Sequence, residues 1–159
     1  MSFVSFVFLA FLALSFFVYY IVPKRFQWIA LLVFSYLYYY LSSHKLIVVL
    51  FVVSLFTWFM GIVIDKNDDK KKRKLYTRIA IIAVLFILIV FKYLNFIIFN
   101  INELFGLNIS LLKLMLPLGI SYFTLQAIAY LYDVGHKKYA AEKNLLHFLL
   151  YMAYFPQIL

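Results

Sequence analysis

The stretch LMLPLGISYFTLQAIAYLY, at residues 114–132, decides how the whole chain folds. As an uncharged helix of 19 residues it is long enough to cross the hydrocarbon core of a bilayer, which is roughly 30 Å thick. Polar side chains nevertheless recur at spacings of four, four and three residues: Tyr122, Gln126, Tyr130 and Asp133. On a helix these spacings place all four within an arc of roughly 80°. Such a face predicts contact with other protein or with a water-filled cavity, because a lipid-facing helix has no use for it.

The composition is that of an integral membrane protein. Of the 159 residues, 67% are hydrophobic, and the mean hydropathy is +0.99. Soluble domains are about 45–50% apolar, and a soluble core of this length could not bury the excess. The net charge of +9 does not indicate nucleic-acid binding, because the basic residues stand in short connections between apolar runs.

The apolar runs predict an all-α, polytopic integral membrane protein with about five transmembrane helices and the start of a sixth. The predicted spans are residues 3–22, 26–41, 46–64, 79–99 and 114–132, followed by an apolar segment at 145–159. That last segment has 15 residues, fewer than the roughly 20 needed to cross. We therefore expect residues 1–159 to be the N-terminal part of one longer transmembrane domain.

Side chains of the second and third runs predict packing rather than ligand binding. Aromatic residues stand at both ends of the second run, which predicts anchors at the membrane interface: Trp28, then Tyr36, Tyr38, Tyr39 and Tyr40. In the third run, spacings of three and four residues predict a small-residue face for close helix packing: Ser54, Thr57 and Gly61.

The basic residues predict the orientation. The connections after the first, third and fifth spans carry two, seven and three Lys or Arg residues. The opposite connections carry only Lys45 and Lys113. The positive-inside rule then places the three basic connections in the cytoplasm and the N-terminus outside. The most charged connection, residues 65–78, is interpreted as a solvated loop, with contact to anionic lipid or a partner as the alternative.

The remaining polar positions suggest no catalytic group. Lys92 and Asn95 fall inside the fourth run, and Lys92 can either snorkel to the interface or pair inside the bundle. Cysteine is absent, and the three histidines show no metal-ligand spacing, so we predict no metal site: His44, His136 and His147. Gly135 is predicted to cap the fifth span, and residues 100–113 to lie along the membrane surface.

Several of these segments together resemble the membrane-bound O-acyltransferase (MBOAT) family. The resemblance is to its bacterial branch of alginate O-acetylation and teichoic-acid D-alanylation proteins. It is carried by LPLGISYFTLQAIAYLYDV at 116–134, NLLHFLLYMAYFPQIL at 144–159, FKYLNF at 91–96 and SYLYYY at 35–40.

The resemblance implies an enzyme of the bacterial cytoplasmic membrane that transfers an acyl group, acetyl by default. The donor would be a cytoplasmic thioester (acetyl-CoA or an acyl carrier protein) and the acceptor a hydroxyl of a cell-envelope polysaccharide, often reached through an extracytoplasmic partner. The family's catalytic histidine lies downstream of a Gly-Pro element that this chain does not reach. We therefore expect the chain to be inactive alone, with its four-residue polar face either lining an acyl-transfer tunnel or packing against neighbouring helices.

Two other classes of function stay open. A polytopic transporter or flippase could also line a substrate path with a polar helix face. A small membrane scaffold without enzymatic activity would need only the packing surfaces.

Overall fold

The computed structural model describes residues 6–42, 47–106, 110 and 119–154. Within these ranges the chain forms six helices and no strand, which confirms the all-α prediction. The helices are α1 (Phe6–Ile21), α2 (Gln27–Ser42), α3 (Ile47–Lys66), α4 (Lys70–Phe105), α5 (Ile120–Gly135) and α6 (Leu145–Ala153).

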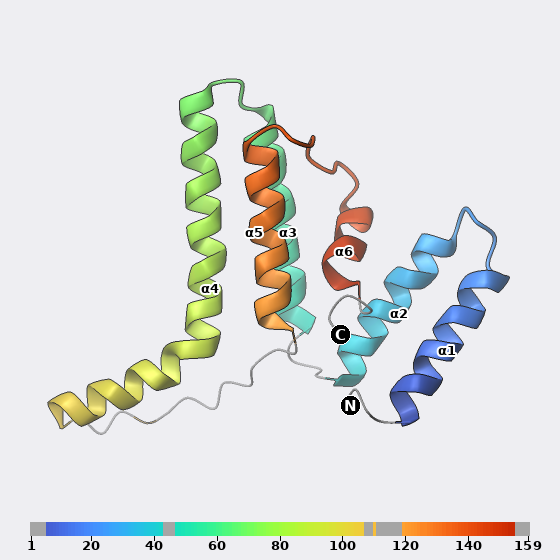
Figure 1. Cartoon of the computed structure of the whole chain (residues 1–159), viewed down its shortest axis with the longest axis horizontal. Coiled ribbons are helices and arrows are strands. Elements are labelled where there is room, and N and C mark those ends of the chain that lie inside the picture. Colours follow the sequence, from blue (N-terminus) through green and yellow to red (C-terminus); the bar gives the residue numbers. More distant parts are fainter. Residues whose placement is uncertain (1–5, 43–46, 107–109, 111–118, 155–159) are drawn as a thin grey trace.

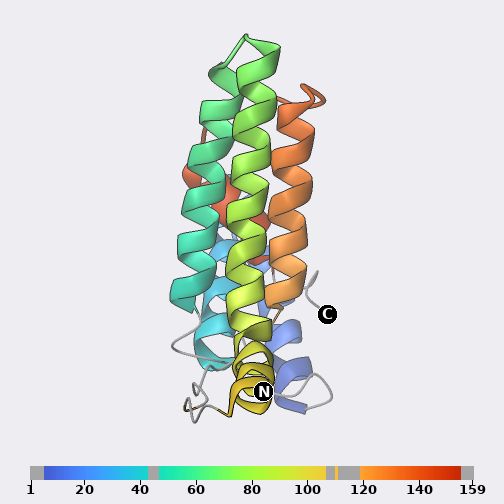
Figure 2. The same ribbon diagram turned by 90° about the vertical axis from the view of Figure 1, so that its left-hand side faces the viewer.

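Three of the helices make the body of the molecule. α3, α4 and α5 lie side by side, and α1 and α2 form a hairpin on the other side of α6 (Figures 1 and 2). The side chains between α3, α4 and α5 are apolar and almost fully buried: Leu50, Val53, Ile64, Ala80, Val84, Phe123, Ala127 and Leu131. Lipid tails are as apolar as these side chains, so close packing rather than removal from water holds such helices together in a bilayer.

The predicted small-residue face of α3 is confirmed. Ser54, Thr57 and Gly61 are all buried. The two hydroxyls donate within the helix, Ser54 Oγ to the Leu50 carbonyl and Thr57 Oγ1 to the Val53 carbonyl, each at 2.7 Å. Because both hydroxyls bond to carbonyls of α3 itself, this face needs no polar partner and α5 can pack closely against it.

The prediction of a loop at residues 65–78 is wrong. α3 continues to Lys66 and α4 begins at Lys70, so only residues 67–69 lie outside a helix. The carboxylate of Asp69 accepts a hydrogen bond from the Lys71 amide at 2.8 Å and caps the start of α4. Lys, Arg and Leu favour helix, and the segment has neither Gly nor Pro. At 1.5 Å per residue, the 36 residues of α4 measure about 54 Å, well beyond the bilayer core.

The C-terminal part of α4 changes direction. It bends away from α3 and α5 (Figure 1) and remains helical to Phe105. Residues 100–105 thus belong to this bent end of α4, and most of residues 106–113 lie outside the described part of the chain, so their position along the membrane surface stays a prediction.

The number of membrane spans stays a prediction. Two helical stretches in the described ranges are long and apolar enough to cross a membrane, Ile47–Lys66 and Lys70–Leu104, and two apolar stretches are shorter, Leu9–Ile21 and Gln27–Leu41. α5 is described only from Ile120 and extends beyond its predicted end to Gly135. α6 begins at Leu145 as predicted and is helical to Ala153, whereas residues 155–159 are not described.

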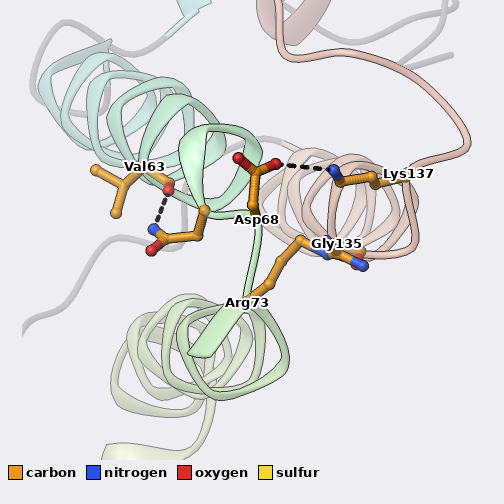
Figure 3. A network of polar contacts seen from close by, with 6 residues as sticks. Val63, Asp68, Arg73, Gly135 and Lys137 are labelled. Carbon is orange, nitrogen blue, oxygen red and sulfur yellow. Dashed lines mark hydrogen bonds and ion pairs between the residues drawn. The ribbon is translucent and has the colours of Figure 1, made fainter. Parts of the chain in front are cut away.

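Gly135 has a different role from the predicted helix cap. It is the last residue of α5, and Lys137 instead takes the left-handed conformation, with φ of 56°. A Cβ atom at position 135 would overlap the side chain of Thr77 on α4. Arg73 points toward Gly135 and donates from Nε to its carbonyl at 3.0 Å (Figure 3). Glycine is therefore needed here for the close approach of α4 and α5.

Gly61→Val should destabilise the fold. A Cβ at position 61 would lie 2.7 Å from Cε1 of Tyr130, so added methyl groups must push α5 away from α3. Overpacking of this kind typically destabilises by about 1–3 kcal/mol. Thermal unfolding of the detergent-solubilised protein measures the effect. Ala129→Val, at an exposed position of α5, is the control, and equal melting temperatures for both variants would contradict this contact.

Candidate functional site

The predicted polar face of α5 lies against α6. Gln126 donates from Nε2 to the Tyr151 carbonyl at 2.8 Å. The ring of Tyr130 contacts those of Phe148 and Tyr151, with centroid distances of 4.8 and 6.3 Å. The opposite side of α5 is the one buried against α3 and α4. The structure thus brings the middle of the predicted face together with a helix that follows it in the chain.

Gln126 caps the C-terminal end of α6 with a hydrogen bond. Tyr151 stands in the last turn of that nine-residue helix, where carbonyl groups have no partner within the helix. The Oε1 atom of Gln126 is also buried, and it accepts no hydrogen bond from the described residues. Leaving such a buried acceptor without a donor lowers the stability of the fold by about 1–3 kcal/mol. It is thus suited to a donor from a ligand or from another part of the protein.

A cleft of about 330 Å³ opens beside Tyr130 and Asp133. It lies between α5, the connection that follows and α6, and its other lining groups include Tyr139, Glu142, His147, Phe148 and Tyr151. The Tyr130 hydroxyl accepts a hydrogen bond from the Glu142 amide at 3.0 Å. The carboxylate of Asp133 is 3.0 Å from Lys138 Nζ, and this hydrogen bond raises the pKa of Lys138 above its ordinary value. The cleft therefore combines aromatic walls with two carboxylates and one imidazole.

Two tyrosines of α2 reach the core beside α5, and sequence reasoning missed them. Tyr39 belongs to the buried cluster that contains Phe123 and Ala127 of α5, and Tyr36 packs against this cluster. The hydroxyls of Tyr36 and Tyr39 are buried without a hydrogen-bond partner among the described residues. The sequence signal is their spacing of three, which puts both on one side of a helix.

The prediction of interface anchors is wrong for part of this group. Tyr38 and Tyr39 are only 1% and 3% exposed, whereas Tyr40 is 50% exposed. The reason is that α2 packs against both α1 and α6, so its aromatic side chains meet protein.

We group the polar side chains of α5 with Tyr151 of α6 and the two buried tyrosine hydroxyls of α2 as the polar track, which ends at the cleft: Tyr36, Tyr39, Tyr122, Gln126, Tyr151, Tyr130 and Asp133. Tyr122 is 39% exposed, so the track is partly open along α5. Its hydroxyl, amide and carboxylate groups can bind and orient a polar ligand. Among the described residues of the track, no nucleophilic side chain lies hydrogen-bonded to a base, so the track is not itself a catalytic centre.

Lys92 and Asn95, the other predicted intramembrane positions, lie on α4. Lys92 is exposed, with Nζ 5.4 Å from the ring centroid of Tyr93. Exposure favours the snorkelling alternative over pairing inside the bundle. Asn95 is half-buried on the same helix. The polar track contains neither residue.

The histidines are spread over different surroundings. His147 lines the cleft and packs edge-on against Trp28, with ring centroids 4.7 Å apart. His136 follows α5, and His44 lies outside the described residues. In the part of the chain that the structure describes, no group of three or more His, Asp or Glu residues could hold a metal ion.

Comparison with known proteins shows which class of protein the chain is similar to. The chain is 30% identical over 146 residues to the probable alginate O-acetylase AlgI of Pseudomonas aeruginosa, a match covering 89% of the chain and 28% of that protein. It is 29% identical over 165 residues to AlgI of Azotobacter vinelandii, covering 100% of the chain and 33% of the relative. A peptidoglycan O-acetyltransferase of Helicobacter pylori is 29% identical over 128 residues, 65% of the chain and 24% of that protein. No family profile and no solved structure matches the chain.

The chain is thus related by sequence to bacterial O-acetyltransferases. The resemblance to the MBOAT family, in its alginate O-acetylase-like branch, is confirmed. The chain spans about a third or less of the length of these relatives.

Gln126→Leu should loosen the end of α6. The substitution removes the donor to the Tyr151 carbonyl, so the amides of α6 should exchange with solvent roughly tenfold faster if a hydrogen bond of about 1–1.5 kcal/mol is lost. Hydrogen–deuterium exchange of the α6 peptide measures this. Leu125→Ala, at a 61% exposed position of α5, should leave that exchange unchanged. Equal protection of α6 in both variants would show that Gln126 does not hold it.

Proposed function

We propose that the protein carrying this chain is a membrane-bound O-acyltransferase. It transfers an acyl group, acetyl by default, from a cytoplasmic thioester donor to a hydroxyl of a cell-envelope polysaccharide. The donor is acetyl-CoA or an acyl carrier protein, and an extracytoplasmic partner delivers or modifies the acceptor. The observation that carries the proposal is the similarity to AlgI over 89% of the chain.

The part played by this chain is to form a wall of the acyl-transfer tunnel. The polar track supplies buried hydrogen-bonding atoms, among them Gln126 Oε1 and the hydroxyls of Tyr36 and Tyr39. A hydroxyl acceptor is a weak nucleophile until a base takes its proton. In this proposal the base is the histidine implied by the family resemblance, and no residue of the polar track is a histidine. Protein walls that exclude water also limit hydrolysis of the thioester.

The cleft beside Tyr130 would receive the uncharged end of the donor. Its rings from Tyr139, Phe148 and Tyr151 suit an acyl thioester, whereas the carboxylates of Asp133 and Glu142 repel phosphate groups. The phosphates of a donor would therefore lie outside this cleft.

We propose that the cleft opens on the cytoplasmic side. The connections α1–α2, α3–α4 and α5–α6 lie toward the same end of the molecule, the upper end in Figure 1. These connections and their flanks hold 12 of the 15 Lys and Arg residues, and excess positive charge marks the cytoplasmic side. The N-terminus is then extracytoplasmic.

This orientation predicts which positions can be labelled from outside the cell. The chain has no cysteine, and any cysteine elsewhere in the full protein is first replaced by serine, so that a single introduced cysteine is the one that is labelled. Lys72→Cys, in the charged start of α4, should react with a membrane-impermeant maleimide only after permeabilisation. Glu103→Cys, near the other end of α4, should react in intact cells. The reverse pattern would invert the proposed topology.

Substitutions in the polar track should lower acyl transfer in the full protein. Tyr122→Phe, Gln126→Leu and Asp133→Asn each remove a hydrogen-bonding or charged group, and misplacing a bound substrate can lower the rate by about 100-fold. We expect losses of roughly 10- to 100-fold, measured as transfer of radiolabelled acetyl groups to the polysaccharide. Protein levels in the membrane must be equal.

Two controls accompany this measurement. Lys92→Gln changes an exposed residue outside the track and should keep normal transfer, while residues 1–159 alone should show none. Normal transfer in all three track variants would refute the tunnel role. The relatives named above are O-acetylating proteins, and they offer no support for a transporter or a scaffold.

A further inference from the structure

A second pocket, of about 320 Å³, lies between the start of α4 and the end of α5. Its walls are Lys74, Arg78 and Ile81 of α4, together with Tyr132 and His136. Thr77 and Gly135 close its floor, where the two helices approach most closely. We call it the basic pocket, and it shares no lining residue with the cleft of the polar track.

The two cations of this pocket are not neutralised. Lys74 and Arg78 are four residues apart and both exposed, so they lie on one side of α4. Neither forms an ion pair within the described residues.

The neighbouring carboxylates are held elsewhere. Asp68 pairs with Lys137 at 3.4 Å (Figure 3). Asp133 pairs with Lys138 at 3.0 Å, and Asp65 accepts a hydrogen bond from the Ala141 amide at 3.2 Å. The pocket is therefore lined by two cations and by no carboxylate, which favours an anion.

His136 adds a third nitrogen-bearing group at a defined position. Its Nδ1 lies 2.8 Å from the Tyr132 carbonyl, and since a carbonyl only accepts, Nδ1 carries the hydrogen. The imidazole also stacks on the ring of Tyr132, with centroids 4.0 Å apart. These two contacts hold the ring at the pocket and leave Nε2 for another partner.

The pocket stands where α4 changes from charged to apolar surface. Directly after Arg78, three apolar side chains of α4 are strongly exposed: Ile79 (50%), Ile82 (66%) and Phe86 (64%). Exposed basic residues next to exposed apolar ones mark the head-group level of a bilayer. A phospholipid fits both surfaces, with its phosphate at Lys74 and Arg78 and an acyl chain along Ile82 and Phe86.

We propose that the basic pocket binds the phosphate of an anionic phospholipid such as phosphatidylglycerol. This assignment develops the lipid-contact alternative for residues 65–78 into a defined site formed by α4, α5 and His136. Lipid binding at this site can be measured directly, so its test is independent of whether the protein transfers acyl groups. Bound lipid would hold α4 against α5 at the level where Arg73 already bonds to Gly135.

The test compares two double variants that lose the same charge. In Lys74→Gln/Arg78→Gln the pocket is neutralised, whereas Lys72→Gln/Lys143→Gln removes two exposed cations that do not line it. Native mass spectrometry of the full protein in detergent measures binding of phosphatidylglycerol and phosphatidylcholine. Each basic group near an anionic head group is worth roughly fivefold in affinity. We therefore expect the pocket variant to lose about 30-fold for phosphatidylglycerol, and the control less than about threefold.

Other outcomes would overturn the assignment. Equal losses in both double variants would mean a general charge effect without a site. Displacement of the bound lipid by millimolar inorganic phosphate, together with no preference over phosphatidylcholine, would identify a free-phosphate site instead. Should the pocket variant unfold at a lower temperature than the control, the single variants Lys74→Gln and Arg78→Gln decide the question. Each should lose about fivefold, and unchanged binding in both would refute the proposal.

Discussion

The packing of Tyr130 against Gly61 is the contact on which the rest of the structure depends. Its ring lies over a position of α3 that has no side chain, and it also contacts Phe148 of α6. Its hydroxyl accepts a hydrogen bond from the Glu142 amide in the connection between α5 and α6. A single side chain thereby fixes α5 relative to three other segments. In lipid, where apolar burial gives helices little reason to associate, such close contacts and hydrogen bonds carry the association.

This contact also separates the two sides of α5. The apolar side, with Phe123, Ala127 and Leu131, is buried against α3 and α4. The polar side is then directed at α6, where Gln126 bonds to the Tyr151 carbonyl and Tyr130 contacts Phe148. An unmatched polar atom is expensive in an apolar medium, so the buried acceptors gathered on this side are the natural place for a ligand or a further protein segment. At its upper end α5 makes a different surface, since the close contact of Gly135 with Thr77 brings Lys74 and Arg78 beside His136.

The type and spacing of residues along the sequence predicted some of these features correctly and others wrongly. The polar face of α5 and the small-residue face of α3 follow from helical periodicity, which depends only on spacing along one helix. The charged segment at 65–78 was misjudged because hydrophilicity indicates exposure to water and not the absence of a helix, and the cap at Asp69 lets α4 start early. Tyr38 and Tyr39 were placed at the interface because aromatic residues near the end of a span usually lie there. Packing of α2 against α1 and α6 buries them.

The sequence by itself determined the all-α class, the membrane character, the polar side of α5 and the resemblance to O-acyltransferases, since all of these depend on composition, spacing and local motifs. Only the tertiary structure decided what the polar side faces. It brought Tyr39 of α2 into the same buried cluster as Phe123 of α5, and Lys74 of α4 beside His136. These partners stand more than 60 residues apart, and the approach of α4 to α5 depends on the close contact between Gly135 and Thr77. Helical period describes the direction of each side chain around its own axis, and it carries no information on which neighbouring helix lies there.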